Sequence, residues 1–257
     1  MGNRRMNEGS IRGVVMKARG RVLRAMAAQL PTAVLFQNGS RHARRVALTF
    51  DDGPGPLTTR FFDVLEAAGA RASFFVIGEK CEGFGEELSD GARRAHDIAG
   101  HGFTHTPFPE LGKRRLEDEL ERTAALLPQR PGQLKMVRPP YGRMTPFSLV
   151  RSFRAGYSSA MWSFDPLDWD LRSAREVVDA VDPALIHNGD IILLHEGPYT
   201  LEALPEIMAR LQNAGFELVT VSTLLRDVAP AAAFAPNHSN GPTNANGSRL
   251  AHSSNGR

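Results

Sequence analysis

Strand-like and helix-like segments alternate along this chain from Arg45 to Val221. Short apolar, often β-branched runs predict strands at 46–50, 72–77, 136–138, 158–164, 190–194 and 217–221. Amphipathic stretches predict helices at 58–68, 86–100, 114–127, 146–155, 172–181 and 201–214. The alternation indicates one α/β domain. Because no glycine-rich phosphate loop follows the first strand, it favours a (β/α) barrel over a dinucleotide-binding fold.

Segments of different composition flank this domain, which we expect to span 45–228. The N-terminal extension, 1–44, is basic, and apolar residues at a spacing of three to four predict a helix over 11–30. This helix either docks on the domain or lies on anionic lipid as a peripheral membrane contact, with disorder as a third reading. The tail, 229–257, is rich in Ala, Pro, Asn, Ser and Gly, and we expect it to be disordered.

Composition and charge exclude several classes of protein. The formal net charge of +3 is too small to indicate a nucleic-acid partner. Cys81 is the only cysteine, which excludes an intrachain disulfide and a zinc site built from thiolates. The sequence has no run of about 18 apolar residues, so we expect no transmembrane helix. Basic residues interrupt 11–30, where a secretory signal would need an apolar core, so a cytoplasmic or membrane-peripheral location is expected.

Polar residues follow the predicted strands at the point where each strand ends. In a barrel these carboxyl ends meet on one face, so we expect the polar residues to lie close together. They are Asp51, Asp52, Arg138, Asp165, Asp168, Trp169 and His195.

Two histidines indicate a metal site. His101 and His105 are four residues apart, a spacing that on one helical turn places both imidazoles on the same side. Such a pair alone is more often structural, and His96, five residues earlier, is interpreted as structural. Two imidazoles and one nearby carboxylate form a three-ligand set that leaves room for water and a substrate oxygen. Zn²⁺ fits this set best, and Co²⁺ is an alternative.

The other polar residues suggest partners for acid–base chemistry. His195 follows a buried strand and is either a rim histidine satisfied by the backbone or a proton donor. Asp168 is a candidate to bind its second ring nitrogen and raise its pKa. Arg138 precedes a rigid Pro-Pro turn and is either a surface residue or the partner that orients Asp51.

Five motifs in this order make the chain resemble the polysaccharide deacetylase family, the NodB-homology domains of carbohydrate esterase family 4. The resemblance covers about residues 45–225. The chain departs from the family's motifs at two positions. Gly102 stands where the family usually has Ser or Thr, and Glu196 stands where Asp is frequent. The motifs are Thr49–Pro54, His101–His105, Arg138–Gly142, Asp165–Trp169 and Leu193–Glu196.

The resemblance implies a distorted (β/α) barrel of seven parallel strands and a role for each motif residue. The catalytic base would be Asp51 and the acid His195. The metal ligands would be Asp52, His101 and His105. Arg138 would support Asp51, Asp168 would support His195, Trp169 and Leu193 would wall the acetyl pocket, and the Tyr141 backbone N–H would bind the oxyanion.

The implied activity is metal-dependent removal of acetyl groups from N-acetylated sugars in a polysaccharide, oligosaccharide or lipid-linked glycan. The same family includes esterases of O-acetylated xylan. A metal- or glycan-binding relative without catalysis is the alternative from another class, which the intact Asp51 and His195 disfavour. Hydrolysis of a non-sugar amide is a third alternative, because a fold does not fix its substrate.

Overall fold

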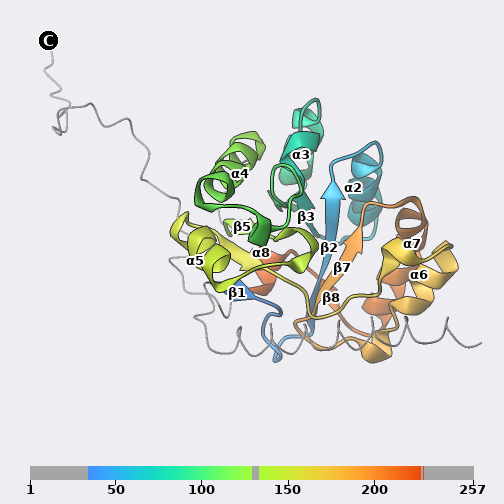
Figure 1. Cartoon of the computed structure of the whole chain (residues 1–257). Coiled ribbons are helices and arrows are strands. Elements are labelled where there is room, and N and C mark those ends of the chain that lie inside the picture. The colour runs from blue at the N-terminus through green and yellow to red at the C-terminus, as the bar shows by residue number, and fades with distance from the viewer. Residues whose placement is uncertain (1–33, 129–132, 227, 229–257) are drawn as a thin grey trace, which may run out of the picture.

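A sheet of parallel strands with helices arranged around its outside forms the molecule (Figure 1). The computed structural model describes residues 34–128, 133–226 and 228. In this part of the chain seven strands follow the order β1-β6-β5-β4-β3-β2-β7, and β8 pairs with β2. Every strand pairing in the sheet is parallel. The strands are β1 (Leu35–Phe36), β2 (Arg45–Gly53), β3 (Ser73–Val76), β4 (Asp97–Gly100), β5 (Met136–Val137), β6 (Ser158–Ala160), β7 (Ile191–His195) and β8 (Glu217–Leu218).

From β2 to β8, each strand leads through a helical segment to the next strand, whereas β1 leads to β2 without one. The α-helices are α2 (Thr58–Ala67), α3 (Gly85–Arg93), α4 (Lys113–Leu126), α5 (Pro146–Arg154), α6 (Ala174–Ala180), α7 (Pro198–Asn213) and α8 (Val221–Leu224). Single 3₁₀ turns are η1 (Gly78–Lys80), η2 (Phe108–Glu110), η3 (Pro140–Gly142), η4 (Asp168–Asp170) and η5 (Pro183–Leu185).

The strands make an incomplete barrel. β1 and β7 stand at the two ends of the strand order, and isolated bridges join Asn38 to Asp190 and Phe164 to Ile192 across the gap. The predicted distorted (β/α) barrel with about seven parallel strands is therefore confirmed.

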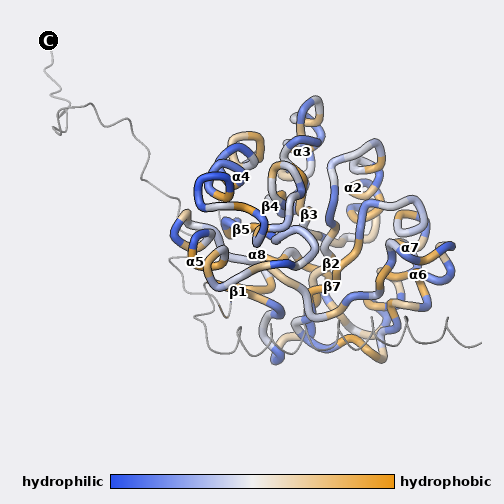
Figure 2. Tube along the Cα trace, in the orientation of Figure 1, coloured by the Kyte–Doolittle hydropathy of each residue, from blue (hydrophilic) through white to orange (hydrophobic). Residues whose placement is uncertain are grey.

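The alternation of side chains along β2 determines where its carboxylates point. Val46, Leu48 and Phe50 are buried in the main core, together with the apolar faces of α2 and α7. Ala47 belongs to a second cluster, which includes residues of β3, β4, β6 and β7. Because side chains alternate with a period of two, Asp51 shares the face of Ala47 and points into the barrel. Figure 2 shows hydrophobic residues concentrated in the central strands and a largely hydrophilic α4.

The predicted helix 86–100 is wrong in its second half. α3 ends at Arg93, and β4 follows as a separate, fully buried strand. Ala95 adopts a φ of 65°, and the His96 N–H donates to the Gly91 carbonyl, which closes the helix. Four residues are too few to show a period, and Asp97 is an unusual strand residue, so the sequence pattern did not reveal β4. His96 is buried and its ring stacks on Phe62.

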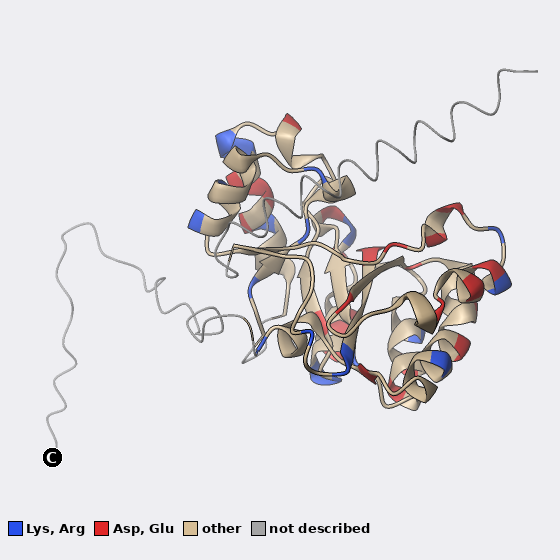
Figure 3. Cartoon of the chain, turned by 90° about the horizontal axis from the view of Figure 1, so that it is seen from below, with Lys and Arg blue, Asp and Glu red and all other residues tan. Residues whose placement is uncertain are grey.

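The start of the described chain adds a strand that the sequence pattern did not predict. β1 lies within the N-terminal extension and pairs with β6 through only two residues. The predicted helix 11–30 and the tail 229–257 lie outside the described residues. No helix in the described part is long and apolar enough to cross a membrane. Lys and Arg are interspersed with Asp and Glu over the helices (Figure 3).

Candidate metal and catalytic site

Three potential metal ligands converge at the carboxyl ends of β2 and β4. Asp52 lies at the end of β2, and His101 follows β4 directly. Asp52 Oδ1 is 3.6 Å from His101 Nε2 and 3.2 Å from His105 Nε2. Within the described residues, these three form the one group whose candidate ligand atoms all lie within 4.8 Å of one another.

The two histidines lie on a loop and not on the helical turn that their spacing predicted. Gly102 has a φ of 79° and His105 a φ of 57°, so two left-handed residues turn the chain back on itself. The imidazole centroids come to 4.9 Å from each other. Glycine adopts this backbone shape without strain, which is a local advantage of Gly102.

The three side chains fit a divalent metal ion. The His101 Nδ1 donates to the Arg138 carbonyl at 2.8 Å, since a carbonyl only accepts, and this leaves Nε2 free as a ligand. Burial lowers the pKa of His101, which favours the neutral imidazole that a metal needs. Burial raises the pKa of Asp52, but the contact with His105 and the charges of nearby histidines outweigh it and lower the pKa to about 2. Asp52 Oδ1 is buried without a well-aligned hydrogen-bond donor, as expected of an atom that awaits a cation.

Asp51 lies beside this group and is paired with a buried arginine. The Arg138 Nη1 donates to Asp51 Oδ1 at 2.6 Å and to Thr49 Oγ1 at 2.8 Å. The carbonyls of Ala160 and Met161 accept from the same guanidinium, whose plane lies over the Phe75 ring at 3.9 Å. The Asp51 Oδ2 atom is 3.7 Å from His101 Nε2. One carboxylate oxygen is thus held by Arg138 while the other faces the candidate metal position.

His195 lies on the adjacent strand and is paired with Asp168. In the sheet register His195 is the partner of Asp51, so both point into the barrel mouth. The His195 Nδ1 is 2.7 Å from Asp168 Oδ1. Burial lowers the pKa of His195, but the hydrogen bond and charge of Asp168, with the charges of Asp51 and Asp52, outweigh it and raise the pKa above its usual value. The arrangement favours an imidazolium that is able to give up a proton.

Comparison with known proteins places this geometry in a family. Residues 38–159 match the family profile described as polysaccharide deacetylase. A chitooligosaccharide deacetylase of Sinorhizobium fredii is 35% identical over 187 residues, which cover 72% of this chain and 84% of the relative. A peptidoglycan-N-acetylglucosamine deacetylase of Bacillus cereus is 30% identical over 203 residues, covering 76% and 95%.

The chain belongs to the polysaccharide deacetylase family. The crystal structure of a CE4 family pseudoenzyme from Bacillus anthracis, 21% identical, matches with a TM-score of 0.69 over 76% of this chain and 70% of that one. This likeness shows the fold alone, and it indicates that activity must be argued from the site residues themselves.

Further residues of the polysaccharide deacetylase motifs surround the site. Tyr141 and Trp169 each expose 64% of their surface, and the Tyr141 ring lies 4.6 Å from the ring of His105. Leu193 is buried on β7, two residues before His195. Asp165 accepts from the Leu167 N–H at 2.9 Å, and burial raises its pKa. Tyr141 therefore presents an exposed aromatic ring beside the candidate metal ligand His105.

Glu196 shows how a departure from the family pattern is accommodated. Its carboxyl group is buried and accepts a hydrogen bond from the Thr58 hydroxyl. Burial raises the pKa of Glu196 to about 7. A Cβ atom at position 53 would lie 1.8 Å from Glu196 Oε1, so the longer side chain needs the glycine at Gly53.

Two threonines that the sequence analysis did not single out support the catalytic pairs. Thr49 accepts from Arg138, and it stands as a lone hydroxyl in an apolar strand, which is a weak signal. Thr200 Oγ1 donates to Asp168 Oδ2 at 2.7 Å, and the His195 N–H donates to the same oxygen at 2.8 Å. Nothing in the sequence indicated Thr200, because its contact spans 32 residues.

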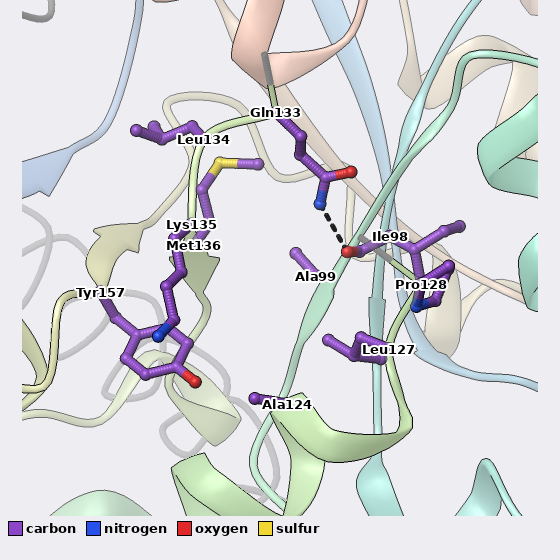
Figure 4. A pocket seen from close by; sticks show the side chains of 10 residues that line it. All are labelled: Ile98, Ala99, Ala124, Leu127, Pro128, Gln133, Leu134, Lys135, Met136 and Tyr157. Atoms are coloured by element: carbon purple, nitrogen blue, oxygen red, sulfur yellow. Dashed lines mark hydrogen bonds between the residues drawn. The ribbon is translucent and has the colours of Figure 1, made fainter. Parts of the chain in front are cut away.

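A small cavity lies elsewhere in the molecule, and none of the candidate site residues lines it (Figure 4). Its volume is about 60 Å³, whereas ligand pockets usually measure about 300–1,000 Å³. The Gln133 amide at its edge donates to the Ile98 carbonyl at 2.7 Å. It is lined by Ile98, Ala99, Ala124, Leu127, Pro128, Gln133, Leu134, Lys135, Met136 and Tyr157.

Proposed function

We propose that this protein is a metal-dependent hydrolase that removes the acetyl group from N-acetylated sugars of a glycan. The observation that carries the proposal is the convergence of Asp52, His101 and His105, with Asp51 and His195 beside them at the same barrel mouth. A relative that only binds metal or glycan would not need Asp51 to be held by the buried Arg138. Nor would it need His195 to be held by the buried Asp168. Membership of the polysaccharide deacetylase family supports the same reading.

The metal ion would be held by Asp52 Oδ1, His101 Nε2 and His105 Nε2. Two nitrogens and one carboxylate oxygen are a ligand set that Zn²⁺ favours and Co²⁺ accepts. When bound, such an ion polarises the acetyl carbonyl and lowers the pKa of water. The remaining residues then control where the substrate lies and where protons go.

Asp51 and His195 divide the proton transfers. Asp51 Oδ2 accepts the proton of the attacking water, while Arg138 fixes the orientation of the carboxylate through Oδ1. His195 Nε2 donates a proton to the sugar nitrogen as the carbon–nitrogen bond breaks, which releases acetate and a free amine. Asp168 holds Nδ1, so that the proton to be given up lies on Nε2. The Tyr141 backbone N–H would stabilise the oxyanion, with Trp169 and Leu193 beside the acetyl methyl.

The names of two relatives support a substrate class. The two most informative ones are named for chitooligosaccharides and for peptidoglycan N-acetylglucosamine, and both substrates carry an N-acetylated glucosamine. Exposed Tyr141 and Trp169 offer stacking surfaces for such rings. We therefore place N-acetylglucosamine-containing glycans ahead of O-acetylated xylan.

The pH profile tests the pairing of His195 with Asp168. Asp168→Asn removes the negative charge that raises the pKa of His195 and leaves one acceptor oxygen for three donors, so the pKa of His195 falls. Because His195 must be protonated to act as the acid, activity should fall at lower pH than in wild type, with the alkaline limb displaced by about one pH unit or more. The measurement is kcat/KM against pH. Asp170→Asn, an exposed neighbour, is the control, and an unmoved alkaline limb in Asp168→Asn would contradict the pairing.

Acetate release tests the function itself. The purified protein is assayed on N-acetylated chitooligosaccharides, peptidoglycan and O-acetylated xylan, before and after a chelator and again after addition of Zn²⁺ or Co²⁺. We expect release from the N-acetylated substrates, loss with the chelator and recovery with metal. Release from xylan alone would move the assignment to an O-acetyl esterase, and no release from any substrate by metal-loaded protein would favour the non-catalytic reading.

A further inference from the structure

The loop that carries His101 and His105 needs an external anchor. Its carbonyl side is held by η1, since the Gly78 N–H donates to the Gly102 carbonyl and the Glu79 N–H to the Phe103 carbonyl, both at 2.9 Å. The His101 N–H donates to the Val76 carbonyl of β3, but the N–H groups of Phe103 and Thr104 donate to no backbone carbonyl of the described residues. A buried N–H without an acceptor is costly, so the fold must supply one from outside the loop.

Glu119 on α4 supplies that acceptor. Glu119 is 4% exposed, which is unusual for a glutamate, and its side chain faces the site loop and not the solvent. Oε2 accepts from the Phe103 N–H at 2.5 Å and from the Thr104 N–H at 2.8 Å. Oε1 accepts from the Thr104 hydroxyl at 2.6 Å. One carboxylate thus accepts three hydrogen bonds from two consecutive residues between the histidines.

We propose that Glu119 is the positioning residue that holds the His101–His105 loop in the shape in which both imidazoles bind one metal ion. The inference rests on the proposed function, because it assigns Glu119 to the same metal site. Glu119 does not contact the metal position and is not among the candidate ligands. It acts through the backbone that sets the separation of the two rings.

Glu119 also lies next to Gly102. In the polysaccharide deacetylase family the residue after the first histidine is usually Ser or Thr, whose hydroxyl Gly102 lacks. Here a hydroxyl stands two residues later, where Thr104 donates to Glu119 and contacts Thr106 Oγ1 at 2.7 Å. A Cβ at position 102 would approach Glu119 Oε2 at 3.5 Å and Pro140 Cγ at 3.3 Å. The carboxylate therefore lies on the side of the loop next to Gly102.

The test measures metal affinity in the apoprotein, without substrate. Co²⁺ is titrated into chelator-treated wild type and variants, and its visible d–d absorption reports both the dissociation constant and the ligand geometry. Glu119→Ala should weaken Co²⁺ binding about 10- to 100-fold, the range found when residues that orient ligands are removed. Glu119→Gln keeps one acceptor oxygen for the two N–H groups and should recover most of the affinity, leaving a loss of about threefold to tenfold.

Controls separate a positioning role from a general loss of fold. Glu121→Ala makes the same change on the exposed side of α4 and should leave the Co²⁺ titration unchanged. Thr104→Val, a smaller lesion in the same network, should weaken binding about threefold to tenfold if Glu119→Ala fails to fold. If folded Glu119→Ala protein binds Co²⁺ as tightly as wild type does, the proposal is overturned. If Glu119→Ala does not fold, wild-type binding by Thr104→Val overturns it in the same way. Wild type that binds no Co²⁺ would instead refute the metal-dependent function.

Discussion

His195→Ala should lower deacetylation of an N-acetylated chitooligosaccharide by about 10²- to 10⁴-fold while the metal content stays at the wild-type level. An amine leaves only when it is protonated, and the Nε2 of His195 is the donor that the pairing with Asp168 prepares. The same variant should lose far less activity on an aryl acetate, whose leaving group needs no proton. The comparison of kcat/KM on the two substrates isolates the acid step from the attack step.

The matched control for this variant is His187→Ala, because the His187 side chain is 77% exposed and lies outside the site. It should leave both rates unchanged. Equal losses on the amide and the activated ester in His195→Ala would assign this histidine to another role, and an unchanged amide rate would remove it from the mechanism.

Asp51→Asn should lower kcat on both kinds of substrate by about 10²- to 10⁴-fold, since water must be deprotonated whatever the leaving group is. The variant should also be less stable, because Arg138 is fully buried and would lose its charged partner. Breaking such a pair costs about 3–5 kcal/mol of the free energy of unfolding. Activity is therefore measured well below the melting temperature of the variant, with denaturant unfolding recorded in parallel.

Asp63→Asn provides the control, because Asp63 is an exposed carboxylate on α2 that pairs with Arg94 at the surface. It should change neither kcat nor the metal content. If folded Asp51→Asn protein, with metal bound, turns over within a few-fold of wild type, Asp51 is not the base, and Asp165 would be the next carboxylate to examine.

Much of the fold could be predicted from periodicity. The β2 run combines apolar residues with a Gly-Pro stop, and α2 and α7 begin and end within a few residues of their amphipathic patterns. β4 was missed because four residues directly after a helix carry no period of their own. β1 was missed because its two residues form a strand only by pairing with β6, more than a hundred residues away.

The sequence predicted which polar residues would lie together at this end of the barrel, but not the residues that hold them in place. Asp51, Asp52, Arg138 and His195 follow strands, and the topology gathers strand ends on one face. His101 and His105 lie together as predicted, but a loop with two left-handed residues brings them together in place of the expected helical turn. Glu119 and Thr200 could not be found, because each meets its partner through tertiary packing of a helix that looks ordinary in sequence.

Metal analysis of purified protein tests the central claim most directly. Wild type, Asp51→Asn and His195→Ala should each contain about one divalent ion per chain after equilibration with Zn²⁺ and removal of the excess. Asp52→Ala, His101→Ala and His105→Ala should each retain little or none, with the fold checked by circular dichroism. One ion per chain in all three of these folded variants would contradict a site made of one carboxylate and two imidazoles.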